Sequence, residues 1–147
     1  GEFYDLGYHE AGRLLERGLA DLARAGLAPR GFIAPAWLLG REAERAVREA
    51  GFLYTTRLGG VLRFSDGRRL RSQSLVYSVR NAWRTTLSLA WNAALARRLR
   101  GNPLARLGLH PPDWGRPRVR RQALRLAARL AADRDVTTYR DWIESLD

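Results

Sequence analysis

A histidine follows a short apolar segment in the second half of the chain. Residues 107–110 read Leu-Gly-Leu-His, and the apolar part has the composition of a short buried strand. Pro111 and Pro112 come next and are expected to stop the strand and to force a turn. In α/β folds, the carboxyl ends of strands are where active sites form. His110 is therefore the predicted carrier of proton chemistry near neutral pH.

Two further residues bear on this assignment. Asp113 lies three positions on, and it could orient the imidazole or cap the turn after Pro112; we favour the turn. His9 is the only other histidine, and it lies in a helix-like stretch where we expect an exposed position. The chain has no cysteine, which excludes disulfides, thiolate metal sites and a cysteine nucleophile.

The composition fits one globular domain with its own core. The chain has 147 residues, of which 46% are hydrophobic and 28% are charged. No apolar run approaches the length that spans a bilayer, and Glu2 and Asp5 lie where a signal peptide would need basic and then apolar residues. We therefore expect a cytoplasmic protein. The sequence contains no methionine, and we expect it to be a fragment or a processed product.

The chain is strongly basic. All 26 basic residues are arginine and the formal net charge is +11, which could attract nucleic acid, anionic lipid or an acidic polymer. The arginines are spread along the chain, so we expect most of them to face solvent on helices. The sequence has no zinc-finger spacing, recognition-helix signature or aromatic-basic strand, which disfavours nucleic acid as a partner.

Alternating helix and strand patterns predict an α/β fold in a single domain, 1–147. The predicted helices are 8–25, 41–50, 82–100, 117–132 and a short last helix after Thr138. The predicted strands are 31–35, 52–57, 105–110 and a hairpin of 61–64 with 69–77 around Asp66-Gly67. The order up to residue 57 indicates parallel strands with crossover helices. The predicted core-facing side of helix 82–100 consists of Trp83, Leu87, Ala90, Trp91, Ala94 and Leu95.

Several segments carry motifs in a recognisable order. Residues 31–37 read Gly-Phe-Ile-Ala-Pro-Ala-Trp, and residues 107–111 read Leu-Gly-Leu-His-Pro. Together with 29–38 and 74–84, they resemble a poorly characterised bacterial branch of the polysaccharide deacetylase-like (NodB-homology) superfamily. The resemblance implies the C-terminal portion of a distorted (β/α) barrel, with an inserted β-hairpin around 61–77. Members of the superfamily remove acetyl groups from N-acetylated sugars with a divalent metal, usually zinc.

The resemblance also implies roles for particular residues. The late Leu-x-Leu-His-Pro segment supplies the general acid, which assigns that role to His110. An early Asp-Asp pair supplies a base and a metal ligand, and a histidine pair supplies two more ligands. Both pairs would lie before Gly1. We therefore expect no metal ligand in this chain and no activity from the chain alone. The usual Arg-Pro-Pro segment appears at 34–36 as Ala-Pro-Ala, without its arginine, and the Asp-x-x-Asp-Trp segment has no clear counterpart after Arg57.

Three residues are candidate contacts for a glycan or a small acetylated sugar. Pro35 and Trp37 follow the end of a strand, where Trp37 could stack on a sugar face or simply cover the end of the barrel. Arg57 ends the next strand and could hold an anionic group, or it could be one surface arginine among many.

The sequence thus predicts part of a metal-dependent hydrolase that deacetylates a glycan, with His110 as its general acid. Two other interpretations stay open. The chain could belong to a family member that keeps the fold and has lost catalysis, because the arginine before Pro35 is missing. It could also be a basic binding module for nucleic acid or another anionic polymer, because of its charge.

Overall fold

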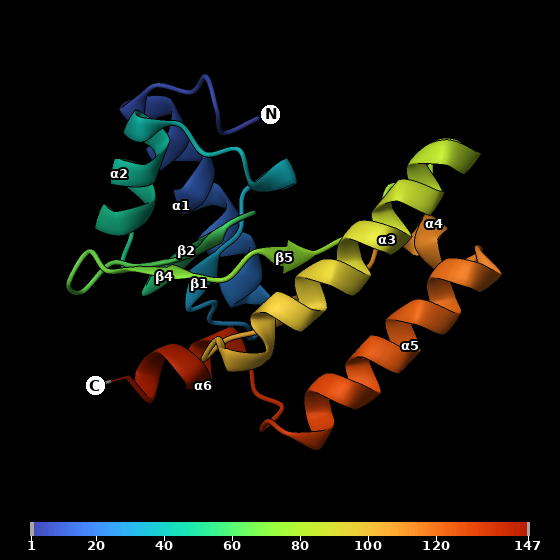
Figure 1. The fold of residues 1–147 in the computed structure, drawn as a ribbon. Helices are drawn as coiled ribbons and strands as arrows, with labels where there is room; N and C mark the ends of the chain where they lie inside the picture. The colour runs from blue at the N-terminus through green and yellow to red at the C-terminus, as the bar shows by residue number, and fades with distance from the viewer. Residues whose placement is uncertain (1, 147) are drawn as a thin grey trace. The chain divides into compact units, whose positions relative to one another are not determined.

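The computed structural model describes residues 2–146 as two compact units of mixed α/β structure (Figure 1). The first unit consists of the chain up to Leu70 together with the segment from Thr137 onward, and the second is Arg71–Val136. The predicted α/β class is confirmed. The prediction of one domain over 1–147 stays a prediction.

The first unit combines three helices with a small sheet. Its helices are α1 (Tyr8–Arg24), α2 (Arg41–Glu49) and α6 (Tyr139–Glu144), and a 3-10 turn, η1, covers Pro35–Trp37. Its strands are β1 (Gly31–Phe32), β2 (Tyr54–Arg57), β3 (Gly60–Arg63) and β4 (Arg69–Arg71), in the order β1-β2-β3-β4. β1 and β2 are parallel, as predicted, and β3 is antiparallel to β2.

The pairing of β1 with β2 depends on a glycine. Gly31 lies opposite Tyr54, and the Tyr54 ring occupies the space that a Cβ atom at Gly31 would need. The absence of a side chain therefore lets the ring cover the first strand. α1 and α2 bury Ala11, Leu15 and Val47 in the core of this unit.

A turn at Asp66-Gly67 links β3 to β4. Gly67 has φ +70°, which suits glycine. The Asp66 carboxylate accepts hydrogen bonds from the Arg63 guanidinium (2.5 Å) and the Arg68 backbone N–H (2.9 Å), and these bonds lower its pKa to about 2. The predicted hairpin strand 69–77 is wrong in its length, because β4 ends at Arg71 and the chain then pairs elsewhere.

The second unit packs helices against one pair of strands. Its helices are α3 (Ala82–Arg98), the 3-10 turn η2 (Leu99–Gly101), α4 (Pro111–Trp114) and α5 (Pro117–Ala132). β5 (Ser74–Leu75) and β6 (Arg106–Leu107) run parallel. The buried core residues of this unit include Leu75, Leu95, Leu99, Tyr77, Val119, Ala123 and Leu126.

The predicted core-facing side of α3 is confirmed at Leu95 and is wrong for its other members. Trp83, Leu87 and Trp91 are 61%, 60% and 55% exposed, whereas Asn92 and Leu95 are buried. Asn92 fixes this orientation, because its amide Nδ2 donates to the Val76 carbonyl oxygen at 2.8 Å. The bond satisfies one side of the buried amide, whereas Asn92 Oδ1 has no hydrogen-bond partner within residues 2–146.

Within residues 2–146 the strands form a four-stranded sheet and a separate pair, and no closed barrel. None of the helices in this part of the chain is long and apolar enough to cross a membrane.

Candidate functional site

His110 follows β6 and precedes a short helix. The Gly108 N–H donates to the Leu75 carbonyl at 2.9 Å, which extends the contact between β6 and β5 beyond the paired residues. Pro111 and Pro112 do not form the expected turn; they begin α4, for which His110 is the N-cap residue. Proline is favoured in the first turn of a helix because no intrahelical partner exists there for its missing N–H.

The His110 imidazole is exposed and has a buried carboxylate behind it. The side chain of His110 is 62% exposed and that of Asp113 is 2% exposed. Asp113 Oδ2 accepts the backbone N–H of His110 at 2.8 Å and lies 3.7 Å from its Nδ1. The carboxylate therefore fixes the backbone at the start of α4. Orientation of the imidazole by Asp113 stays a prediction, because the 3.7 Å to Nδ1 is longer than a hydrogen bond.

Tyr77 is a third polar group in this region. Burial and, secondly, the negative charge of Asp113 raise the pKa of Tyr77 to about 12. Its hydroxyl is buried and has no hydrogen-bond partner within residues 2–146. The ring packs with Val119 and Ala123 of α5. Tyr77 thus forms part of the packed support near the Asp113 carboxylate.

The strand-end residues of the first unit are held in an unusual backbone conformation. Ala36 and Trp37 have φ +54° and +58°, a region that residues with a Cβ atom rarely adopt. Pro35 is exposed and Trp37 is half-buried. They lie just beyond the carboxyl end of β1, so Pro35 and Trp37 do reach an edge of a parallel strand pair, as predicted.

Arg57 ends β2, which is parallel to β1, and it binds its own chain. Its guanidinium donates to the Leu39 carbonyl oxygen at 3.2 Å and forms an ion pair with Glu44 of α2. Arg57 therefore binds a carboxylate, but this carboxylate is that of Glu44 in the same chain. The ion pair links α2 to the end of β2. A role for Arg57 in binding a ligand stays a prediction.

The structure thus places the predicted residues in two sets. Pro35, Trp37 and Arg57 belong to the first unit, and His110 and Asp113 to the second. Within residues 2–146, no three His, Asp or Glu side chains come together in a way that could hold a metal ion.

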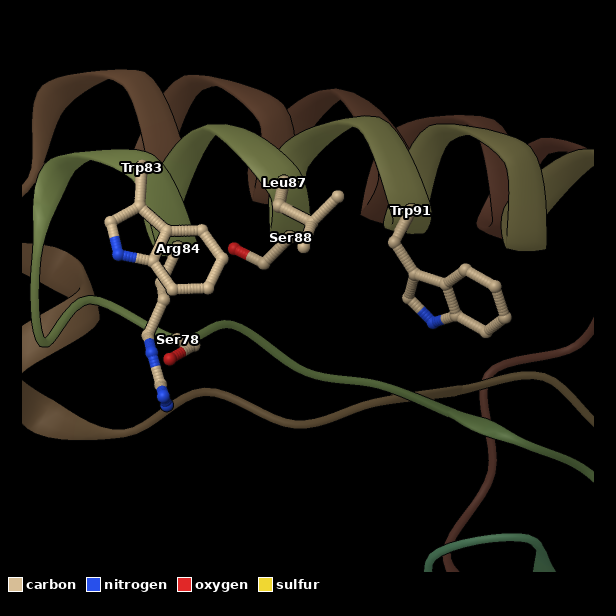
Figure 2. Close-up of a pocket in the computed structure, with 6 residues that line it drawn as sticks. All are labelled: Ser78, Trp83, Arg84, Leu87, Ser88 and Trp91. Atoms are coloured by element: carbon tan, nitrogen blue, oxygen red, sulfur yellow. The ribbon is translucent and has the colours of Figure 1, made fainter.

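A separate hollow lies beside α3. Trp83, Leu87 and Trp91 project from one side of this helix in a row, above Ser78 and next to Arg84 and Ser88 (Figure 2). They line a shallow cavity of about 380 Å³. Side chains expected in the core thus form an exposed apolar surface of the second unit.

Sequence reasoning missed two positioning residues. Arg106 is 4% exposed, and its Nε donates to the Ser72 carbonyl oxygen at 2.9 Å, which fastens β6. Asn92 orients α3 in the same way. The sequence did offer a signal for each of them. One is an arginine in an otherwise apolar strand and the other is an asparagine in an otherwise apolar helix, and a polar residue in such a place indicates a buried hydrogen bond. No family model, curated protein or solved structure matches this chain.

Proposed function

We propose that this chain is the C-terminal part of a metal-dependent, polysaccharide deacetylase-like hydrolase. Its substrate would be an N-acetylated sugar or glycan, and His110 would be its general acid. The observation that carries the proposal is the exposed His110 imidazole with the buried Asp113 carboxylate 3.7 Å from its Nδ1. His110 lies within the Leu-Gly-Leu-His-Pro segment on which the resemblance depends, and Asp113 comes two residues after that segment.

The chemistry needs a proton donor at the departing nitrogen. Hydrolysis adds water across the amide C–N bond, and the amine leaves only when its nitrogen gains a proton. The His110 imidazolium would donate this proton from Nε2, since Nδ1 faces Asp113. The carboxylate would restrict the rotation of the ring, as the acidic partner of a catalytic histidine does elsewhere.

The strand arrangement also supports this proposal. Each unit contributes one pair of parallel strands, β1 with β2 and β5 with β6, as a barrel of alternating strands and helices requires. β3 and β4 come between these pairs in the sequence and correspond to the proposed inserted hairpin. We therefore retain a distorted (β/α) barrel as the proposed fold of the whole enzyme.

The proposed substrate rim consists of Pro35, Trp37 and Arg57. Trp37 would offer an aromatic surface to a sugar ring, and its strained backbone is typical of segments held in place for binding. The divalent metal, with zinc as the proposed ion, would be held by residues outside this chain. Such an ion would supply Lewis-acid activation of water when bound.

The proposal predicts that His110 is required for turnover and His9 is not. The encoded polypeptide that contains this chain would be assayed for acetate release from N-acetylglucosamine oligomers with added zinc. His110→Ala should lower kcat by about 10²–10⁴-fold, the usual contribution of a general acid. The matched control is His9→Ala, because His9 is exposed on α1 and its ring lies beside that of Tyr8.

Two results would count against the proposal. Equal activity of the two alanine variants would remove His110 from the mechanism. A wild-type protein that binds the oligomers but releases no acetate would favour the catalytically degenerate interpretation. Circular dichroism spectra of both variants would show whether any loss of activity comes from unfolding.

A further inference from the structure

The second unit, Arg71–Val136, carries the whole net charge of the chain. Arg71–Val136 holds 14 of the 26 arginines but only three of the 15 acidic residues, which gives it a formal charge of +11. In the other unit, 12 arginines and 12 acidic residues cancel. A charge asymmetry of this kind between two parts of a chain points to an anionic partner of the basic part.

Within the basic unit, the arginines gather on two helices that pack together. Neither α3 nor α5 contains an acidic residue. On α5, steps of three and four residues place Arg118, Arg121, Arg125 and Arg129 along one side of the helix. At a rise of 1.5 Å per residue, this arginine row extends over about 16 Å.

A groove separates the C-terminal halves of α3 and α5. Its volume is about 690 Å³, and its lining includes Arg97 and Arg100 from one side and Arg125 and Arg129 from the other. Ala93, Ala96, Leu126 and Leu130 supply its apolar lining. The groove shares no lining residue with the tryptophan cavity of α3.

The four groove arginines are not neutralised by their surroundings. Within residues 2–146 none of their guanidinium groups takes part in an ion pair or a hydrogen bond. Asp133 is the single acidic residue of the lining. Arg134 differs from the four, because its guanidinium donates to the carbonyl oxygens of Leu99 and Arg100 and so closes the end of α3. The remaining guanidiniums are free to bind anions.

We infer that the groove between α3 and α5 binds the phosphate backbone of a single-stranded nucleic acid. Guanidinium groups bind phosphate through paired hydrogen bonds. Arg125 and Arg129 are one helical turn apart, a rise of about 6 Å, and successive phosphates of a strand follow at a similar interval. The row continues through Arg121 and Arg118 beyond the groove, which suits a linear polyanion better than one small anion.

The shape and lining of the groove favour a single nucleic-acid strand over a bilayer surface as the ligand. A bilayer surface is flat and cannot enter a groove between two helices, whereas a single strand can. The lining has no aromatic side chain on which bases or sugar rings could stack. Recognition would therefore depend on backbone charge and not on base sequence. This inference is independent of the proposed deacetylase function, because His110 and Asp113 do not line the groove.

Salt-dependent binding of a labelled oligonucleotide tests the inference. Fluorescence anisotropy would measure the Kd of the whole chain for 12-nucleotide single strands of mixed sequence, between 0.05 and 0.2 M salt. About four phosphate contacts should give a slope of log K against log salt near −3. Arg125→Gln with Arg129→Gln should raise Kd at least tenfold and reduce the slope by about 1.4.

The matched control is the double variant Arg13→Gln with Arg17→Gln. These two arginines are also exposed and four residues apart, but they lie on α1 in the neutral unit. The inference requires the control to keep the wild-type Kd and slope. An equal loss of affinity in both double variants would overturn it, because binding would then follow net charge alone.

Competing polyanions test the class of the ligand. Duplex DNA of the same length, a polyuronate and vesicles with anionic lipid would each compete with the labelled strand. Weaker competition by all three supports the assignment to single-stranded nucleic acid. A polyuronate or a vesicle that binds more tightly and depends on Arg125 and Arg129 would overturn it.

Discussion

At the scale of single residues, the polar groups near His110 differ in how well they are paired. Asp113 accepts a hydrogen bond from the His110 backbone, whereas the buried Tyr77 hydroxyl has no partner within the described chain. An unpaired buried hydroxyl costs desolvation energy without a compensating bond. The Tyr77 ring, by contrast, contributes to the packing against Val119 and Ala123.

We therefore predict that Tyr77→Phe leaves the free energy of unfolding at pH 7 unchanged or raises it by up to about 1 kcal/mol. Urea unfolding followed by tryptophan fluorescence would measure the change. Tyr4→Phe is the control, since Tyr4 is 56% exposed and should show no effect. A loss of more than about 1 kcal/mol in Tyr77→Phe would mean that the hydroxyl has a stabilising partner.

The same substitution should alter stability at alkaline pH. The pKa of Tyr77 in the folded protein is raised to about 12, so the unfolded chain ionises first, from about pH 10. This contribution to stability is complete below pH 10 and is lost as pH rises towards 12. Tyr77→Phe should lessen the alkaline loss without abolishing it, because burial also raises the pKa of Tyr54.

At the scale of elements, η1 is the strained connection of the first unit. Ala36 has a positive φ, and this conformation costs an alanine roughly 1–2 kcal/mol relative to its ordinary region. Glycine adopts the same angles without that cost but loses more conformational entropy on folding. The strain falls on the segment that carries Pro35 and Trp37, the proposed substrate rim.

Ala36→Gly should therefore raise the free energy of unfolding by about 0.5–1 kcal/mol. Ala128→Gly is an informative control, because Ala128 is exposed within α5 and should lose about 1 kcal/mol. Urea denaturation of both variants would show opposite signs. A destabilised Ala36→Gly protein would contradict the strain inferred from the backbone angles.

At the scale of the whole molecule, charge is distributed very unevenly. The basic unit has 14 arginines against three acidic residues, so its folded form concentrates positive charge that the neutral unit does not. Two like charges about 10 Å apart in water repel each other by about 0.4 kcal/mol. Many such pairs in one unit oppose its compact state.

Raising the salt concentration from 0.01 to 0.15 M should therefore stabilise the protein, by on the order of 1 kcal/mol, because the Debye length falls from about 30 to 8 Å. Urea unfolding at the two concentrations would measure the gain. The double variant Arg118→Gln with Arg121→Gln should show a smaller gain. Stability that falls with salt would mean that ion pairs outweigh the repulsion.

Local patterns predicted most of the secondary structure. The helix expected over 117–132 has those bounds, and the helix expected over 82–100 runs from Ala82 to Arg98. Thr138 caps α6 by accepting the Asp141 N–H, as its position before the last helix suggested. Helix limits depend on capping residues, proline and glycine, which act over a few positions and can therefore be read directly from the sequence.

The sequence by itself determined the helices and the parallel pairing of the first two strands. It also determined which candidate residues follow strands. Only the tertiary structure decided which side of α3 is buried, where β5 finds its partner, and that Arg57 pairs with Glu44. It also decided that the positive charge belongs to one unit. These features depend on contacts between residues far apart in the chain, such as Asn92 with Val76, whose free energies no local pattern contains.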